Sequence, residues 1–343
     1  MTQLLVVDDS SFMRKSLTYL LESDHALRVV GTAADGGEAV RKVRQLRPDV
    51  VILDIEMSVM NGLTALTHIM AERPTPILVL TGLNQADASI AAKCLEQGAV
   101  DVIVKPSGVI SYDIDALRSE IIAKVKIAAA VNVQNLGSRS ANDSLRLRSS
   151  ANKLNGNKIV VIGASTGGPQ AMTTILSSLP SSFAASVLVV QHMSAAFVPY
   201  FAESLKGKCP FDVAVAREDE PFAPGRAVVA PGDSHTLVAR SNGSFRVRLS
   251  SEASPLAIFP SVDYAMASAA EAYGVGAVGV LLTGDGRDGA LGMQILKAAG
   301  GTTLAADPAC CLAPGMPQAA IDLRCIDRVL SLRLLAQAVA EMV

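Results

Sequence analysis

Apolar and polar positions along the first third of the chain alternate in two ways. Short apolar runs, typical of buried strands, are separated by longer segments in which apolar residues recur every three or four positions. The predicted strands span residues 3–9, 27–33, 50–54, 76–81 and 100–106, and the predicted helices span residues 11–23, 36–46, 63–72, 88–98 and 113–130. This alternation predicts a doubly wound, five-stranded parallel sheet in a domain of about 125 residues.

The alternation stops after residue 130. Residues 134–157 are rich in Ser, Asn and Gly, and their charges are almost all basic, which favours a solvated, flexible segment over a packed one. A second alternation begins at residue 157. We therefore predict a first domain at residues 1–130, a flexible linker at 131–156 and a larger second domain at 157–343.

The second domain is also predicted to be a doubly wound α/β domain. Its apolar runs at 160–163, 186–192 and 275–284 predict strands, and residues 287–300 predict a helix. Residues 227–250 differ, because they predict strands and a β-hairpin around the turn Ser241-Asn242-Gly243.

Composition narrows the class of protein. A length of 343 residues and a hydrophobic fraction of 50% allow two sizeable cores, and a net charge of −2 gives no reason to expect a nucleic-acid partner. Five cysteines, an odd number without metal-site spacing, favour a reducing compartment. Acidic residues near the start argue against a signal peptide, and no apolar run approaches the roughly 20 residues of a membrane helix. We expect a soluble cytoplasmic protein without membrane insertion.

Acidic residues gather where the predicted strands of the first domain end. Asp8 and Asp9 end the first strand, Asp54 the third, Thr81 the fourth and Lys105 the fifth. The carboxyl ends of parallel strands meet at one edge of the sheet, where functional residues gather. Three carboxylates there would suit Mg²⁺, and a lysine and a hydroxyl could hold phosphoryl oxygens, although a single strand-end Asp more often caps a helix.

The segments VVDDSSFMR and LDIEMSVMNGL, with Thr81 and the pair Lys105-Pro106, resemble the receiver domain of two-component response regulators. The resemblance covers about residues 1–125 and implies a flavodoxin-like fold. It implies that a histidine kinase phosphorylates Asp54, and that Asp8, Asp9 and Asp54 bind Mg²⁺. It also implies that Thr81 and Lys105 contact the phosphoryl group.

Three positions depart from the receiver pattern. Ser58 stands where the family usually has Pro, and Asn61 replaces a common Asp. Val102 stands where many members carry an aromatic residue that rotates on activation. The last departure bears on the usual aromatic switch and leaves the phosphorylation chemistry untouched.

The glycine-rich segment Gly163-Ala164-Ser165-Thr166-Gly167-Gly168 follows the first strand of the second domain. A dinucleotide-binding turn would need a glycine where Ser165 stands, because a side chain there blocks the approach of a pyrophosphate. The same letters fit G-x-S-x-G, in which a sharp strand-to-helix turn exposes a nucleophilic serine. A turn without a catalytic role remains the alternative.

A nucleophilic serine needs a base and an acid that orients it. His192 ends the strand at 186–192 and would emerge at the same sheet edge as Ser165, whereas His235 lies in a turn-rich segment and is the less constrained candidate. Asp285 and Asp288 lie in a glycine-rich turn after another apolar strand, where either could reach His192 or merely cap the next helix.

The motifs GASTGG, QHM, FPSVD, LTGDGRDG, DP and PGMP together are similar to the chemotaxis protein-glutamate methylesterases of the CheB family. The resemblance implies that Ser165 is the nucleophile, His192 the general base and Asp288 the orienting acid, with no cofactor in this domain. Asp285 stands where the family commonly has Met, in a turn that helps line the oxyanion site.

The family resemblance implies a phosphorylation-activated hydrolase. Such an enzyme removes methyl groups from glutamate γ-methyl esters of chemoreceptors, releases methanol and also deamidates certain receptor glutamines. The implied partners are chemoreceptors as substrate and a chemotaxis histidine kinase as phosphodonor, and the implied oligomeric state is a monomer. A receiver-controlled binding regulator without catalysis is the alternative, and a transcriptional regulator is disfavoured because no basic recognition helix stands out.

Overall fold

The computed structural model describes residues 1–82, 85–105, 114–131, 158–241 and 243–343. The chain divides into two compact units, an N-terminal unit at Met1–Ser140 and a C-terminal unit at Ala141–Val343. The predicted linker lies outside the described residues except for Val131, as do Pro106 and the central Asn242 of the predicted hairpin turn. No helix in the described part of the chain is long and apolar enough to span a membrane.

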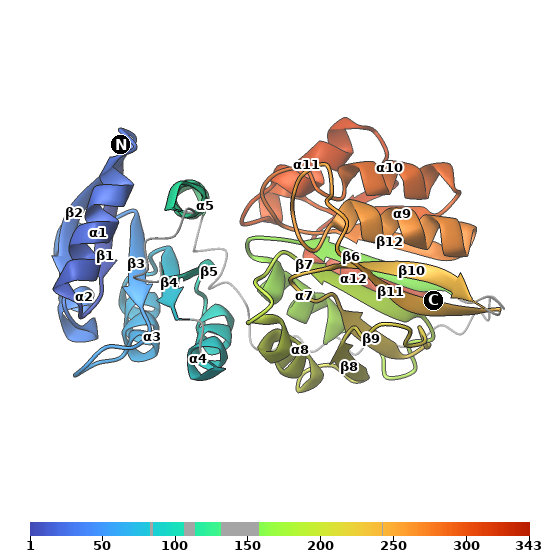
Figure 1. Cartoon of the computed structure of the whole chain (residues 1–343), viewed down its shortest axis with the longest axis horizontal. Helices are drawn as coiled ribbons and strands as arrows, with labels where there is room; N and C mark the ends of the chain where they lie inside the picture. The colour runs from blue at the N-terminus through green and yellow to red at the C-terminus, as the bar shows by residue number, and fades with distance from the viewer. Residues whose placement is uncertain (83–84, 106–113, 132–157, 242) are drawn as a thin grey trace. The chain divides into compact units, whose positions relative to one another are not determined.

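The N-terminal unit is a five-stranded parallel sheet in the order β2-β1-β3-β4-β5, the flavodoxin-like arrangement that the sequence predicts. Its strands are β1 (Thr2–Val7), β2 (Leu27–Ala33), β3 (Val50–Asp54), β4 (Ile77–Thr81) and β5 (Asp101–Val104). Its helices are α1 (Ser11–Glu22), α2 (Gly36–Leu46), α3 (Gly62–Glu72), α4 (Gln85–Glu96) and α5 (Ile114–Ala130). The strands are short apolar runs because helices cover both sheet faces (Figure 1).

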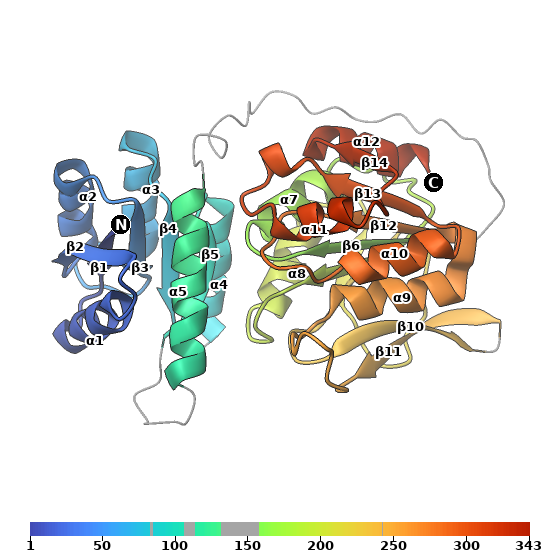
Figure 2. The same cartoon turned by 90° about the horizontal axis from the view of Figure 1, so that it is seen from above.

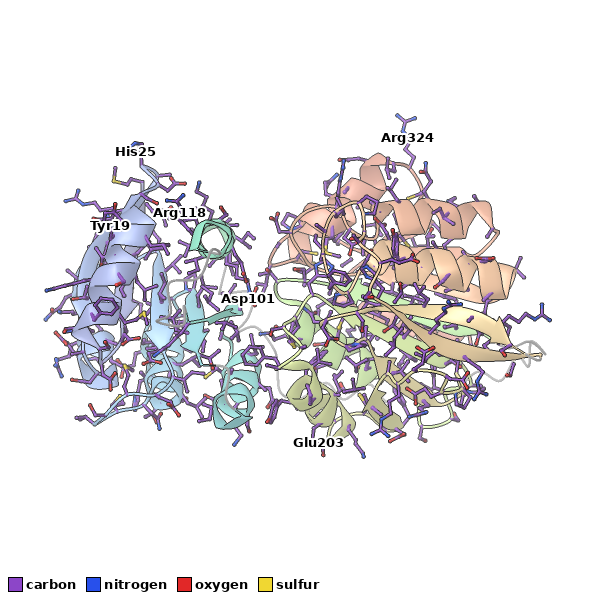
Figure 3. The ribbon with its side chains drawn as sticks, viewed as in Figure 1. Tyr19, His25, Asp101, Arg118, Glu203 and Arg324 are labelled. Atoms are coloured by element: carbon purple, nitrogen blue, oxygen red, sulfur yellow. The ribbon has the colours of Figure 1, made fainter. Side chains whose placement is uncertain are left out.

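Polar caps explain where α1, α2 and α3 begin. Ser10, Asp35 and Asn61 each accept a hydrogen bond from a backbone N–H in the first turn of α1, α2 and α3. Asn61 is one of the departures from the receiver pattern, and it performs the capping that an Asp would perform there. The α1 face turned to solvent carries Tyr19, which is labelled in Figure 3.

The C-terminal unit is built on a seven-stranded parallel sheet in the order β14-β13-β12-β6-β7-β9-β8, with a separate antiparallel hairpin of β10 and β11. The strands are β6 (Ile159–Ala164), β7 (Ser186–Gln191), β8 (Asp212–Val215), β9 (Arg226–Val229), β10 (His235–Ser241), β11 (Ser244–Ser250), β12 (Ala277–Leu281), β13 (Thr302–Ala306) and β14 (Arg328–Leu330). Both predictions, a doubly wound sheet and a hairpin, are confirmed.

Helices cover both faces of this larger sheet (Figures 1 and 2). One apolar core joins the sheet to α7 (Gly168–Leu176), α8 (Val198–Lys206) and α12 (Leu332–Glu341). The other core joins it to α9 (Val262–Tyr273), α10 (Ala290–Ala298), α11 (Gly315–Asp322) and the hairpin. The predicted helix at 287–300 begins only at Ala290, because the glycine-rich turn before it extends to Gly289.

The strand order places a topological switch point at β6. The next strand in the chain, β7, pairs with one edge of β6, and β12, which comes later in the chain, pairs with the other edge of β6. In doubly wound sheets the crevice outside the carboxyl ends of such strands is the usual place for a site. The segments that leave the carboxyl ends of β6, β7 and β12 contain Ser165, His192 and Asp288, respectively.

Candidate active site

Ser165 lies in a sharp turn between β6 and α7. Its backbone N–H donates to Thr283 O at 3.0 Å, and its carbonyl accepts from Gly168 N at 2.8 Å, so the turn is held on both sides. Gly167 adopts a left-handed conformation with φ of 78°, which a glycine adopts without strain. The side chain of Ser165 is half-buried between buried neighbours, which is the exposure expected of a nucleophile turn.

His192 and Asp288 are in direct contact. His192 directly follows β7, whose last residue Gln191 pairs with Ala164 at the end of β6. His192 Nε2 lies 2.8 Å from Asp288 Oδ2, and both side chains are largely buried. Of the two acids in the glycine-rich turn, Asp288 is the one in contact with this histidine.

Asp288 is held in place by the start of α9. Its carboxylate accepts hydrogen bonds from Val262 N at 2.7 Å, Asp263 N at 3.0 Å and Ser261 Oγ at 3.1 Å. Burial opposes ionisation, but the His192 ring and the backbone amides outweigh it and lower the pKa of Asp288 below its usual value. Asp288 is therefore an oriented, ionised partner for an imidazole, as a triad acid must be.

Within the described residues, the Ser165 hydroxyl has no hydrogen bond to His192 or to any other group. The two residues nevertheless follow neighbouring strands directly after a register pair, so their main chains emerge side by side. Hydrogen bonds between nucleophile and base are often long in unliganded enzymes and tighten when substrate binds.

His235 has a structural role and is not a competing base. Its Nδ1 accepts from Ser261 N at 2.9 Å, its Nε2 faces Glu252 O at 2.8 Å, and its ring stacks on Phe259 with centroids 4.3 Å apart. The side chain is completely buried, and this burial lowers the pKa of His235. Because both ring nitrogens are engaged with the backbone, neither is available to a serine.

Asp285 is exposed, whereas Asp288 in the same turn is buried. A side chain in solvent stabilises or opposes a buried oxyanion only weakly, because water screens its charge. Asp285, which stands where the family commonly has Met, therefore does not add a second buried carboxylate to the turn.

Asp263 is a second acidic residue beside Asp288 and was missed by the sequence analysis, although it lies in the motif FPSVD. Its Oδ1 accepts from Gly289 N at 2.8 Å and Gly292 N at 2.7 Å, at the start of α10. Asp263 thus caps α10, the helix that follows Asp288, and Asp288 accepts from the first two amides of α9, the helix that contains Asp263. Burial, with the neighbouring Asp288 charge, raises the pKa of Asp263 to about 6.

The raised pKa of Asp263 predicts a pH-dependent stability. Between the usual carboxyl pKa of 3.8 and about 6, the folded state binds a proton that the unfolded state has lost, so stability falls as pH rises through this window. We expect Asp263→Asn to remove this contribution. Calorimetry at pH 4 to 8 should show the variant's unfolding temperature rising relative to wild type between about pH 4 and 6, and no further change above about pH 7.

The exposed Asp322 on α11 provides the matched control, because Asp322→Asn should leave the pH dependence unchanged. The difference between variant and wild type cancels contributions from the N-terminal unit. Parallel curves for Asp263→Asn and wild type would contradict a perturbed Asp263.

The N-terminal unit brings together the acidic pocket predicted from the strand ends, which we define as Asp8, Asp9, Asp54, Thr81 and Lys105. The three acids offer oxygens within 4.8 Å of one another. Lys105 Nζ lies 3.1 Å from Asp8 Oδ2 and 2.7 Å from Asp54 Oδ2. Burial raises the pKa of Asp54 to about 6, against the opposing effect of the Lys105 ammonium.

The acidic pocket fits a hard divalent cation. The Oδ2 atoms of Asp8 and Asp54 are buried, and both face the Lys105 ammonium. Carboxylate oxygens are the protein ligands that Mg²⁺ prefers. Thr81, which is also buried, ends the neighbouring strand β4.

Arg14 is a further residue at the acidic pocket that strand-end reasoning missed. Its guanidinium donates to Asp8 O at 2.7 Å and to Asp9 O at 3.0 Å. It therefore fixes the backbone that carries both acids. The quoted segment VVDDSSFMR contains Arg14, but only its position one turn into α1 shows that it can reach these carbonyls.

Comparison with known proteins gives matches along both units. The family described as "CheB methylesterase" matches residues 160–339, and the family described as "Response regulator receiver domain" matches residues 4–111. A protein of Symbiobacterium thermophilum named protein-glutamate methylesterase/protein-glutamine glutaminase is 40% identical over 353 residues, covering 99% of this chain and 97% of its own length. A protein of the same name from Pyrococcus abyssi is 41% identical over 344 residues, covering 99% of this chain and 93% of its own length.

Among solved structures, the CheB methylesterase catalytic domain of Thermotoga maritima is similar to the C-terminal unit. It is 36% identical, with a TM-score of 0.54, and the match covers 55% of this chain and 100% of that domain. The family match covers more than half of the chain, and the named relatives align along nearly all of it. This chain therefore belongs to the CheB methylesterase family and carries a response-regulator receiver domain at its N-terminus.

Proposed function

We propose that this protein is a phosphorylation-activated hydrolase that demethylates glutamate γ-methyl esters of chemoreceptors and deamidates specific receptor glutamines. The names of the full-length relatives support the substrate and the reaction. The single observation that carries the mechanism is the contact of 2.8 Å between His192 Nε2 and Asp288 Oδ2, beside the turn that exposes Ser165. The five free cysteines are in keeping with action in the reducing cytoplasm.

In the first step, Ser165 Oγ attacks the ester carbonyl carbon and its proton passes to His192. Because Nε2 faces Asp288, the acceptor is Nδ1, and Asp288 stabilises the imidazolium that forms. The proton then passes from His192 to the departing methoxide, which leaves as methanol. With a glutamine substrate the leaving group is ammonia.

In the second step, water hydrolyses the acyl-enzyme. His192 removes a proton from the water, and the new carboxyl group leaves as glutamate while Ser165 regains its proton. The start of α7, only three residues after Ser165, supplies positive potential for the oxyanion that forms in both steps. This chemistry uses no metal in the C-terminal unit.

Regulation is proposed to begin at Asp54 in the acidic pocket. A carboxylate oxygen of Asp54 attacks the phosphorus of a phosphohistidine on the chemotaxis histidine kinase, the P–N bond breaks so that the kinase imidazole leaves, and an acyl phosphate forms on Asp54. Asp8, Asp9 and Asp54 would hold Mg²⁺, which when bound neutralises the charge of the phosphoryl group. Lys105 and Thr81 contact the phosphoryl oxygens, and the modification shifts the protein toward a more active state.

The experiment that tests this function is methanol release from methylated chemoreceptor, with and without acetyl phosphate and Mg²⁺. We expect release that rises when both are present, and release at the basal rate when EDTA removes the metal. Phosphorylation at Asp54 without any methanol release would instead support the alternative, a receiver-controlled binding regulator.

Asp54→Asn should abolish the stimulation and leave the basal rate intact, because the amide cannot form an acyl phosphate. Allosteric couplings are commonly about 5- to 150-fold, and the phosphodonor effect should fall from that range to none. Asp49→Asn is the matched control. Asp49 directly precedes β3, at the opposite end of the strand from Asp54, and its carboxylate accepts a hydrogen bond from Gln3 N. Stimulation that persists in Asp54→Asn would place the phosphorylation elsewhere.

A further inference from the structure

Gln191 is a buried amide between the nucleophile and the base. It is the last residue of β7, and its side chain Nε2 donates to Ser165 O at 2.8 Å and to His192 O at 3.0 Å. Both partners are carbonyl oxygens, which accept only, so the orientation of the amide is fixed by its surroundings. One side chain therefore ties together the main chains of the two residues on which the proposed reaction depends.

We call the two hydrogen bonds from Gln191 Nε2 to Ser165 O and His192 O the clamp. Two further observations indicate that the surroundings of Gln191 are shaped for it. A Cβ at Gly168 would overlap Gln191 Oε1, so the second glycine of the pair Gly167-Gly168 leaves room for the amide. Oε1 itself is buried and has no hydrogen-bonding partner within the described residues. An unsatisfied buried carbonyl is unfavourable, and an apolar side chain of the same shape would avoid it. The presence of an amide at position 191 is thus explained by the hydrogen bonds of its NH₂ group and not by the packing of the side chain.

The clamp also follows from the strand register. Ala164 and Gln191 are register partners at the ends of β6 and β7, and His192 N donates to Ala164 O at 3.0 Å. The strand pairing of β6 with β7 ends at this point. Gln191 extends the connection by one more residue on each strand.

We propose that Gln191 is a positioning residue that sets the separation of Ser165 and His192 for proton transfer. The inference rests on the proposed function, in which Ser165 Oγ gives its proton to His192. Misplacing reacting groups by about 1 Å can lower a rate by about 100-fold. Loss of the clamp therefore acts on the chemical step and not on the binding of the ester.

The test compares Gln191→Met with wild type. Methionine keeps the length and loses both hydrogen bonds, so kcat for methanol release should fall about 10- to 100-fold while KM stays within about threefold. Gln337→Met is the matched control, because Gln337 is exposed on α12 and its amide donates to Glu341. A kcat for Gln191→Met within twofold of wild type would overturn the proposal.

Gln191→Glu adds a readout that a merely structural role would not move. A protonated glutamic acid can donate one hydrogen bond to a carbonyl, whereas the carboxylate can donate none and repels both carbonyls. The ratio of kcat for Gln191→Glu to kcat for Gln191→Met should therefore fall as pH rises from 6 to 9. His192 and its partner Asp288 are present in both variants. A constant ratio would contradict the clamp.

A second measurement separates this inference from the proposed function. A fluorophosphonate reacts with an activated serine as Oγ attacks phosphorus, fluoride leaves and the proton passes to the base, so no receptor is needed. We expect Ser165 to be labelled about 10- to 100-fold more slowly in Gln191→Met, by intact mass. Equal labelling overturns the clamp, as does the absence of labelling in wild type. Labelling without methanol release would overturn the proposed substrate alone.

If Gln191→Met fails to fold, Gly168→Ala provides an independent variant. Its Cβ would displace Oε1 and the attached amide without removing the amide from the protein. The same fall in kcat and in labelling is expected, and wild-type rates in a folded Gly168→Ala protein would count against the clamp.

Discussion

Ser165→Ala is expected to lower methanol release by about 10⁴- to 10⁶-fold, with or without the phosphodonor. Alanine removes the Oγ that would form the acyl-enzyme. The backbone hydrogen bonds of Ser165 to Thr283 and Gly168 do not involve the side chain, so the fold should survive. Release is measured from methylated receptor over several hours, alongside the thermal unfolding of each protein.

The matched control for this prediction is Ser177→Ala. Ser177 is an exposed serine that follows the last residue of α7, and its replacement should leave the rate within about twofold of wild type. A Ser165→Ala protein that retains a tenth of the wild-type rate would show that the nucleophile is another group.

Asp288→Asn is expected to lower kcat by about 10³- to 10⁴-fold. The carboxylate faces His192 Nε2 at 2.8 Å and accepts the N–H there, which leaves Nδ1 as the proton acceptor. An asparagine can present its NH₂ to Nε2 and so favour the tautomer with the proton on Nδ1, where it blocks the transfer from Ser165. The rate is measured as for Ser165→Ala.

Asp285→Asn is the control that the turn itself offers. Asp285 lies three residues before Asp288 and is exposed, so we expect its replacement to change kcat less than about threefold. A large loss in Asp285→Asn together with a small loss in Asp288→Asn would reverse the assignment of the orienting acid.

The strand-end residues of both units could be predicted because their position depends on local pattern alone. An apolar run followed by a polar residue marks the carboxyl end of a strand, and parallel strands bring such ends to one sheet edge. Asp54 and Thr81 are the last residues of β3 and β4, and Ser165 and His192 directly follow β6 and β7.

Gln191 and Asp263 could not be assigned a role in this way. Gln191 reaches a carbonyl 26 residues earlier in the chain, and Asp263 reaches amides 26 and 29 residues later. Such contacts depend on strand register and on how closely α9 and α10 approach. Both residues lie in the quoted motifs QHM and FPSVD, but a motif does not show which of its members touch the reacting groups.

The sequence alone determined the order of strands and helices in the N-terminal unit and the residues that follow β6 and β7, because hydrophobic period and turn chemistry are local properties, whereas β8, β13 and β14 were not predicted. The tertiary structure decided between the histidines and between the acids. The two ring nitrogens of His235 are engaged by the backbone of Ser261 and Glu252. Of the two acids in the glycine-rich turn, only Asp288 is buried. Those outcomes depend on which elements pack together, since a hydrogen bond is decided by distance in space and not along the chain.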